Sequence, residues 1–268
     1  LFSRPRRARD GFFEDIAAGF KMSHVWRAFA WDEMQQRYRR SILGILWIFV
    51  SYAVFVGAIA FFFAGFAQMG SRRFTIYVAL GFSTFQFLVG NITDGCQVFS
   101  SSGHWIKSAT LPYSIYVYKS VFRSIFTFAL QLAVTIMIMA YFGERPTWQF
   151  LLALPALAIF LLDAVALQYL LGLFGARYRD VPHLIGTLTR VLFFMTPIIW
   201  VREEMHGVRA VFADFNPLTH FLEIFRAPLM GAAPRLVSWE VALVATGVIW
   251  LAAAVAAWRM RRRLPFWV

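Results

Sequence analysis

Four polar residues inside long apolar stretches are the side chains of this sequence that could do chemistry. Asn91 and Asp94 lie three residues apart, on one face of the expected helix. Asp163 and Arg190 each lie in a different apolar stretch. Ionisable groups are costly inside a membrane and often mark proton relays or substrate pathways. The structural alternative is that the polar groups form helix-packing hydrogen bonds and that Arg190 extends its guanidinium to the interface.

The sequence carries none of the local motifs of nucleotide, hydrolase or zinc-protease sites. It lacks G-x-x-x-x-G-K-[ST], G-x-S-x-G, H-E-x-x-H and G-x-G-x-x-G. The histidines are scattered, and no two share metal-ligand spacing with a carboxylate on one helix face. The single cysteine, Cys96, excludes an intrachain disulfide and a zinc cluster built on cysteines. We therefore expect no catalytic residue, no metal site and no cofactor on this chain.

A basic cluster formed by Arg37, Arg39 and Arg40 precedes the first long apolar stretch, which begins at Ile42. Such a cluster could bind nucleic acid or the phosphates of lipid headgroups. Its position immediately before an apolar stretch favours headgroup phosphates, which guanidinium groups bind through charge-assisted hydrogen bonds.

Aromatic residues recur in two of the apolar stretches. Tyr52, Phe55 and Phe62 form a stripe at helical spacing, and Phe193 and Phe194 are adjacent in a later stretch. Aromatic rings present broad apolar faces. The C–H faces of sugars pack on such rings, so a passage lined by them would suit a glycan. The alternative is that the rings simply face lipid or pack in the core.

The composition indicates what kind of protein must position these residues. Of 268 residues, 60% are hydrophobic and only 15% are charged, and the mean hydropathy is +0.61. Soluble domains carry about 25% charged residues, so an ordinary soluble protein and a disordered chain are both excluded. The formal net charge of +12 would indicate nucleic acid in a soluble protein. In this chain, cytoplasmic loops beside an anionic leaflet explain it.

Six apolar stretches are long enough to cross a membrane, because about 20 apolar residues span the hydrocarbon core as a helix. We therefore predict an all-α, polytopic membrane protein with six transmembrane helices. Apolar residues at helical spacing over 12–31 predict an amphipathic helix in the interface. The stretch 218–230 is too short to cross and predicts a re-entrant segment. The expected spans are about 42–66, 74–98, 121–142, 148–176, 184–201 and 241–258.

The expected organisation has three parts: a cytoplasmic segment over 1–41, a transmembrane domain over 42–258 with the re-entrant segment 217–231, and a basic tail over 259–268. Cytoplasmic loops carry an excess of Lys and Arg. One side of the membrane holds eighteen: nine before residue 42, four after residue 258, three between the second and third spans, and two between the fourth and fifth. The other side holds seven. Both termini are therefore expected in the cytoplasm.

Four segments carry a resemblance to a known family. They are QRYRRSILGILW at 36–47, ARYRDVPH at 176–183, FFMTPIIW at 193–200 and NPLTHFLEIFRAPLMG at 216–231. In order and spacing they resemble permease subunits of type-2 ABC exporters of polysaccharides, and the resemblance covers most of residues 30–260. The segment WDEMQQRYRRS at 31–41 is most similar to the O-antigen and lipopolysaccharide branch. Capsule and teichoic-acid exporters are related.

The resemblance implies an assembly and a substrate. It implies a homodimer in the bacterial inner membrane that works with two separate ABC ATPase subunits. ATP and Mg would bind to those subunits, which fits the absence of a phosphate-binding motif here. The substrate would be an undecaprenyl-linked polysaccharide, carried through a channel lined by the aromatic residues.

The resemblance also assigns expected sites to residues of this sequence. The pyrophosphate of the lipid would contact Arg37, Arg39 and Arg40, and the channel would be lined by Tyr52, Phe55, Phe62, Phe193 and Phe194. Coupling to the ATPase would use the segment 100–116 and the turn between the fourth and fifth spans. The coupling residues would be His104, Trp105, Ile106, Lys107, Arg177, Tyr178, Arg179 and Asp180. The far-side gate would contain Asn216, Pro217, His220, Glu223 and Arg226.

Two other functions stay open from the residues alone. A proton-coupled secondary transporter would use Asp94, Asp163 and Arg190. An integral-membrane enzyme acting on a glycan lipid would need a constellation of carboxylates or histidines at a membrane face. The sequence shows no such constellation.

Overall fold

The computed structural model describes residues 11–39, 41–65, 69–145, 147–204 and 206–268, and these ranges are helical without any strand. The all-α prediction is confirmed. In chain order the helices are α1 (Phe12–Lys21), α2 (Ser23–Tyr38), α3 (Leu46–Phe63), α4 (Ser71–Gly95), α5 (Gly103–Ser108), α6 (Ser114–Tyr141), the 3₁₀ turn η2 (Trp148–Leu152), α7 (Ala153–Arg177), α8 (Val181–Met195), η3 (Arg202–Glu204), α9 (Val208–Phe215), α10 (Pro217–Leu229), α11 (Leu236–Met260), η4 (Arg261–Arg263) and α12 (Leu264–Trp267).

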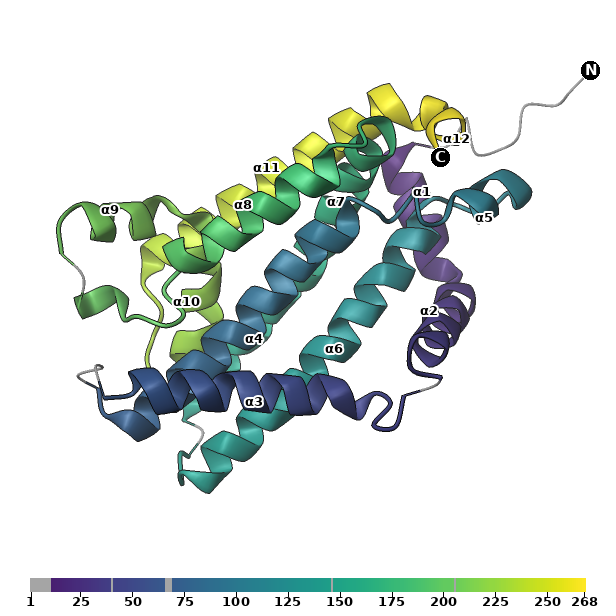
Figure 1. The fold of residues 1–268 in the computed structure, drawn as a ribbon. Helices are drawn as coiled ribbons and strands as arrows, with labels where there is room; N and C mark the ends of the chain where they lie inside the picture. Colours follow the sequence, from purple (N-terminus) through teal and green to yellow (C-terminus); the bar gives the residue numbers. More distant parts are fainter. Residues whose placement is uncertain (1–10, 40, 66–68, 146, 205) are drawn as a thin grey trace, which may run out of the picture.

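The long helices α4, α6, α7 and α11 form a bundle in which α7 packs on α4 and α11, and α4 packs on α6 (Figure 1). Helix α3 lies across α4 and α6 rather than along them. Helices α1, α2, α5 and α12 gather at one end of the bundle, and α9 and α10 lie at the other. We refer to these as the α2 end and the α10 end.

Five helical segments in the described ranges are long and apolar enough to cross a membrane: 46–63, 71–95, 114–141, 148–177 and 236–267. The predicted fifth span, 184–201, is divided. Helix α8 has 15 residues and ends at Met195, and Thr196 takes an extended conformation with φ −99° and ψ 136°. The residue before a proline disfavours helical geometry, so Pro197 ends the helix there. A sixth crossing would therefore have to be formed by α8 together with the irregular residues that follow it.

The amphipathic segment predicted over 12–31 also differs from a single helix. The chain turns at Met22, between α1 and α2, and α2 continues to Tyr38. Helix α1 approaches the start of α6 closely at Gly19, where a Cβ would collide with the hydroxyl of Ser114. Close approach at this glycine seats α1 on the start of α6.

Polar residues inside the bundle are paired between helices. Gln168 of α7 donates to the side-chain oxygen of Asn91 on α4 (2.6 Å), and Thr246 of α11 donates to the carboxylate of Asp163 (2.9 Å). Backbone approach is equally close, since a Cβ on Gly175 would collide with the carbonyl of Cys96. These contacts hold α4, α7 and α11 together where lipid provides no hydrogen bonds.

Candidate functional site

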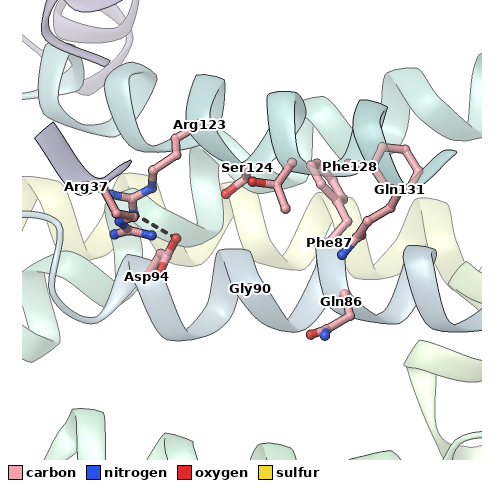
Figure 2. A pocket seen from close by; sticks show the side chains of 10 residues that line it. Arg37, Gln86, Phe87, Gly90, Asp94, Arg123, Ser124, Phe128 and Gln131 are labelled. Carbon is pink, nitrogen blue, oxygen red and sulfur yellow. Dashed lines mark hydrogen bonds and ion pairs between the residues drawn. The ribbon is translucent and has the colours of Figure 1, made fainter. Parts of the chain in front are cut away.

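A polar cavity of about 230 Å³ lies between α2, α4 and α6 at the α2 end (Figure 2). Its walls combine cations, carboxylate, amides and hydroxyls with two buried aromatic rings, Phe87 and Phe128. This mixture can hydrogen-bond a hydrated ligand while also offering apolar contact. The lining residues are Arg37, Gln86, Phe87, Gly90, Asp94, Arg123, Ser124, Thr127, Phe128 and Gln131.

Arg123 is the centre of an ion-pair group beside this cavity. It donates to Glu33 of α2, and its other terminal nitrogen lies 2.8 Å from a carboxylate oxygen of Asp94 on α4. Lys119, one turn earlier on α6, pairs with Glu33 at 2.8 Å. We call Glu33, Asp94, Lys119 and Arg123 the α2-end cluster. It ties α2 to two helices of the bundle, α4 and α6.

The electrostatics of Glu33 follow from these contacts. Burial raises the pKa of the Glu33 carboxyl, but the hydrogen bond and charge of Lys119 and the charge of Arg123 outweigh it. The net pKa therefore lies below its usual value, and Glu33 is held ionised. A second cavity, of about 180 Å³, lies against the same ion pairs and shares Arg37, Asp94 and Arg123 with the first.

The structure places the predicted basic cluster at this site only in part. The exposed side chain of Arg37 lines both cavities. Arg39 is exposed at the end of α2. Arg40 lies outside the described residues. The sequence reasoning did not connect Glu33 or Lys119 with the site, and the usable signal was that Lys119 and Arg123 are four residues apart on one helix face.

Three of the predicted channel aromatics, Tyr52, Phe55 and Phe193, form a cluster around Phe82 of α4. Phe55 stacks on Phe82 with ring centroids 4.1 Å apart, and Phe193 of α8 meets both rings at 6.5 and 6.3 Å. Phe82 was not predicted, because its stretch is rich in aromatics without a distinctive spacing. The cluster thus joins α3, α4 and α8.

The predicted aromatics differ in exposure. Tyr52 is buried, and its hydroxyl donates to the Ala79 carbonyl at 2.6 Å and lies 2.7 Å from the Thr135 hydroxyl. Phe194 is 69% exposed beside Phe193. Phe62 is 68% exposed and lies apart from the cluster, packed on Phe61.

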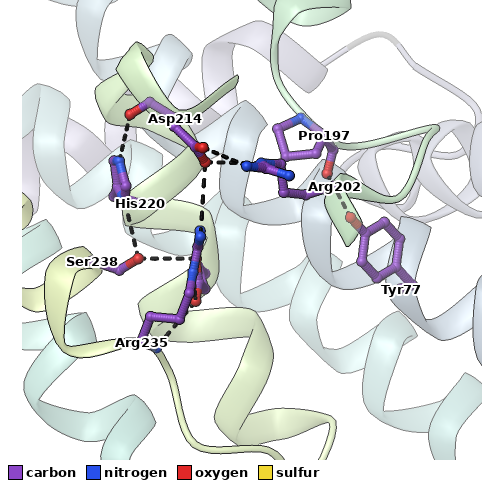
Figure 3. A network of polar contacts seen from close by, with 8 residues as sticks. Tyr77, Pro197, Arg202, Asp214, His220, Arg235 and Ser238 are labelled. Atoms are coloured by element: carbon purple, nitrogen blue, oxygen red, sulfur yellow. Dashed lines mark hydrogen bonds and ion pairs between the residues drawn. The ribbon is translucent and has the colours of Figure 1, made fainter. Parts of the chain in front are cut away.

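The α10 end carries a second polar assembly (Figure 3). Asp214 of α9 accepts from Arg202 at 2.8 Å, and the Arg235 guanidinium lies 3.7 Å from the same carboxylate oxygen. The hydrogen bonds and charge of Arg202 lower the pKa of Asp214. Glu223 of α10 accepts from Arg235 at 2.8 Å and from Ser238 at 2.9 Å. These pairs fasten α9, α10 and the start of α11 to one another.

His220 and Asn216, two of the predicted gate residues, belong to the same assembly. His220 is buried, with Nδ1 2.9 Å from the Ser238 hydroxyl and Nε2 2.8 Å from the Asp214 carbonyl. Asn216 caps α10, since its side chain accepts from the Leu218 amide at 3.0 Å. Pro217 occupies the first turn of α10, where its missing N–H costs nothing.

Arg226 joins this assembly to the broken end of α8. Its side chain is 7% exposed, donates to the Pro197 carbonyl at 2.6 Å, and lies 3.7 Å from the ring centroid of Tyr77. The Tyr77 hydroxyl donates to the carbonyls of Pro197 and Trp200, both at 3.2 Å. The helix break exposes carbonyls that would otherwise be unsatisfied, and buried polar groups require partners. We call Tyr77, Arg202, Asp214, His220, Glu223, Arg226, Arg235 and Ser238 the α10-end network.

The comparisons with known proteins agree with this architecture. Residues 24–230 match the family described as ABC-2 type transporter. The chain belongs to the ABC-2 type transporter family. An O-antigen export system permease protein RfbA of Myxococcus xanthus is 23% identical over 239 residues, which cover 86% of this chain and 89% of that protein. A protein of the same name from Klebsiella pneumoniae is 20% identical over 199 residues, covering 74% and 77%.

These matches confirm the resemblance to type-2 ABC permeases and, within them, to the O-antigen branch. The protein is a multi-pass membrane permease of an ABC transporter. Permeases of this family work with an ATPase subunit. The expected coupling residues of this ABC-2 permease all lie at the α2 end, on α5 and between α7 and α8.

The coupling residues differ in what they can touch. His104, Trp105 and Lys107 of α5 are exposed, as are Arg177, Tyr178, Arg179 and Asp180 around the α7–α8 loop. Ile106 is 3% exposed and packs in the hydrophobic core. Ile106 therefore holds α5 in place, and its neighbours are the side chains that face outward.

Within the described ranges of this ABC-2 permease, the residues that a proton-coupled transporter would use do not contact one another. Asp94 is paired with Arg123, Asp163 accepts from Thr246, and Arg190 is exposed on α8. Each carboxylate thus has its own partner on a neighbouring helix. These contacts fit the interpretation of helix packing for Asn91, Asp94 and Asp163.

Proposed function

We propose that this chain is the transmembrane subunit of an ATP-driven exporter of a lipid-linked polysaccharide of the O-antigen type. Two copies form a homodimer in the bacterial inner membrane with cytoplasmic termini, and two separate ATPase subunits bind ATP and Mg. The substrate is an undecaprenyl-linked glycan taken from the cytoplasmic side. The observation that carries the proposal is the aromatic cluster in which Phe55 of α3 and Phe193 of α8 meet on Phe82.

The cavity at the α2 end suits the pyrophosphate and first sugars of such a lipid. Arg37 is exposed in the cavity, so it can donate charge-assisted hydrogen bonds to phosphate oxygens. Arg123 is held by Glu33 and Asp94, so its guanidinium is fixed at the cavity wall with its charge balanced by the two carboxylates. Gln86 and Gln131 offer amide groups for sugar hydroxyls. Arg39, exposed at the end of α2, adds positive charge beside Arg37, and Arg40 follows it in the sequence.

The aromatic cluster suits the passage of the polymer. Aromatic rings bind sugars through apolar faces and impose little order on hydroxyl positions. Weak contacts of this kind allow a long polymer to slide, whereas a site of directed hydrogen bonds would hold it. Exposed Phe194 extends this surface beyond Phe193.

Energy reaches the path through the two coupling segments. Closure of the ATPase subunits displaces α5 and the turn formed by Arg177, Tyr178, Arg179 and Asp180. That turn leads directly into α8, which carries Phe193. Helix α3 follows because it packs on α4 and α6. Movement of α3 and α8 then opens the passage, and the α10-end network closes its far side.

Replacement of Phe55 tests the proposal. Phe55→Ala removes the closest ring contact of the cluster, so ATP-dependent export in proteoliposomes that hold the permease with its ATPase is expected to slow about tenfold, while ATP hydrolysis is retained. Phe62→Ala is the matched control, because Phe62 is exposed and outside the cluster. Unchanged export in a Phe55→Ala, Tyr52→Ala double variant would remove these residues from the passage.

A further inference from the structure

Helix α12 lies between the two segments expected to contact the ATPase. A Cβ built on Gly103, the first residue of α5, would lie 3.4 Å from the Cβ of Val268. On the other side, the Arg177 guanidinium lies 5.1 Å from the ring centroid of Trp267, within the range of a cation–π interaction. The neighbouring residues Trp267 and Val268 therefore contact two segments that are far apart in the sequence, the end of α7 and the start of α5.

The base of α12 is fixed in the bundle. Leu264 is fully buried in the same hydrophobic core as Ile106 of α5. Arg261 is 6% exposed, and its guanidinium donates to the Gly11 carbonyl and to the Asp15 carboxylate, both at 3.1 Å. Residues 261–268 are therefore attached to the bundle at one end and to both coupling segments at the other.

Asp15 extends this attachment to α6. Its carboxylate accepts from the backbone amides of Tyr113 (3.1 Å) and Ser114 (2.8 Å), at the start of α6. A carboxylate at a helix N-terminus is stabilised by the helix dipole and by the unpaired amides. The coupling segment 100–116 contains α5. Its C-terminal end is thus fixed by the same Asp15–Arg261 pair that fixes the base of α12.

We propose that α12 fastens α5 to the α7–α8 loop, so that both ATPase-facing segments move as one body. Trp267 is the positioning residue on the Arg177 side, and the Gly103–Val268 contact is its counterpart on the α5 side. A displacement of either loop by the ATPase then reaches α4, α6 and α8 together. This inference rests on the proposed function, because it assumes that the two loops receive the ATPase.

A reversible cross-link tests whether the contact persists during transport. The chain has a single cysteine, so Cys96→Ser gives a background without thiols. Gly103→Cys with Val268→Cys should form a disulfide on oxidation, because disulfides join Cβ atoms about 3.5–4.5 Å apart. The permease is reconstituted with its ATPase, and export per ATP is compared before and after dithiothreitol. Equal export per ATP in the oxidised and the reduced protein supports the proposal that the two segments move as one rigid body.

In the cross-linking experiment, two results would overturn the proposal: absence of the disulfide, or export that is blocked when oxidised and restored by reductant. Cross-linking does not require export, so a protein that forms the disulfide but exports nothing counts against the proposed function and leaves the contact intact. Trp267→Ala gives an independent readout. It should raise the ATP consumed per polymer several-fold, whereas Trp258→Ala, which changes a 78% exposed tryptophan on α11, should not. An unchanged ATP cost in Trp267→Ala would also overturn the proposal.

Discussion

The α2-end cluster and the α10-end network use the same residue types for different tasks. At the α2 end, ion pairs border open cavities, and Arg37 remains exposed to them. At the α10 end, Arg226 and Tyr77 are buried against backbone carbonyls freed by the break at Pro197. The first arrangement leaves donors free for a ligand, and the second uses its donors on the protein itself. Charged groups in a membrane protein can thus serve binding or backbone satisfaction, and their partners decide which.

The largest effect is expected at the α10 end, from the loss of the Arg226 side chain. Arg226→Ala leaves the Pro197 carbonyl without its charged donor in a buried site, and removing such a partner costs about 3 kcal/mol. The measurement is the apparent melting temperature of the purified permease in detergent. Arg190→Ala is the control, since Arg190 is exposed. If both variants melt alike, Arg226 does not support the break.

The next effect tests the α2 end through activity rather than stability. Arg37→Ala should lower the rate of export about tenfold, equivalent to about 1.4 kcal/mol, with an unchanged melting temperature. Arg39→Ala should have a smaller effect, because Arg39 lies outside the lining of both cavities. Equal losses in the two variants would show that general positive charge matters, and not the cavity.

A smaller loss of stability is expected from Tyr77→Phe. The change removes the hydroxyl that donates to Pro197 and Trp200, and one hydrogen bond contributes about 1 kcal/mol. The ring beneath Arg226 remains, so the cation–π contact is kept. Melting of Tyr77→Phe should fall between those of the unaltered protein and Arg226→Ala, and a value below Arg226→Ala would reverse the order of importance.

The smallest effect is a dependence on pH at the α2 end. The folded-state pKa of Glu33 lies below the ordinary value of 4.5. Its contribution is therefore complete above about pH 4.5 and is lost as the pH falls through the lower, folded-state value. Glu33→Gln should flatten this part of the melting temperature–pH curve. Asp214→Asn is the matched change at the α10 end, where the carboxyl pKa is also lowered, and a curve unaffected by Glu33→Gln would contradict the assigned ion pairs.

Local patterns were sufficient for the elements but not for their partners. Apolar runs predicted the long helices, because crossing a membrane requires about 20 apolar residues in sequence. The expected re-entrant segment 217–231 begins at Pro217, as α10 does, whereas the expected fifth span ran on to residue 201, past the end of α8 at Met195. No local pattern could show that Arg123 would meet Glu33, 90 residues earlier, because that contact depends on how α2 packs on the bundle.

The same limit applies to the aromatic stripe. Helical spacing grouped Tyr52, Phe55 and Phe62, but α3 lies across α4 and α6, so residues at the same spacing do not meet the same neighbours. Phe55 meets Phe82 and Phe193, whereas Phe62 is exposed although Ile59 and Ala64, on either side of it, are buried against α4. Periodicity within α3 cannot show which of its residues meet a neighbouring helix, because that depends on how the helices cross.

The buried Asp15 has a consequence for the order in which the protein is built. Its carboxylate is satisfied by the amides of Tyr113 and Ser114 and by Arg261, which follow it by 98, 99 and 246 residues. A ribosome synthesises α1 long before any of these partners exists. These contacts therefore cannot be complete before Arg261, which follows α11, has been made. The first of the described helices thus completes its contacts only after α11 has been made, so its docking depends on a residue near the other end of the described chain.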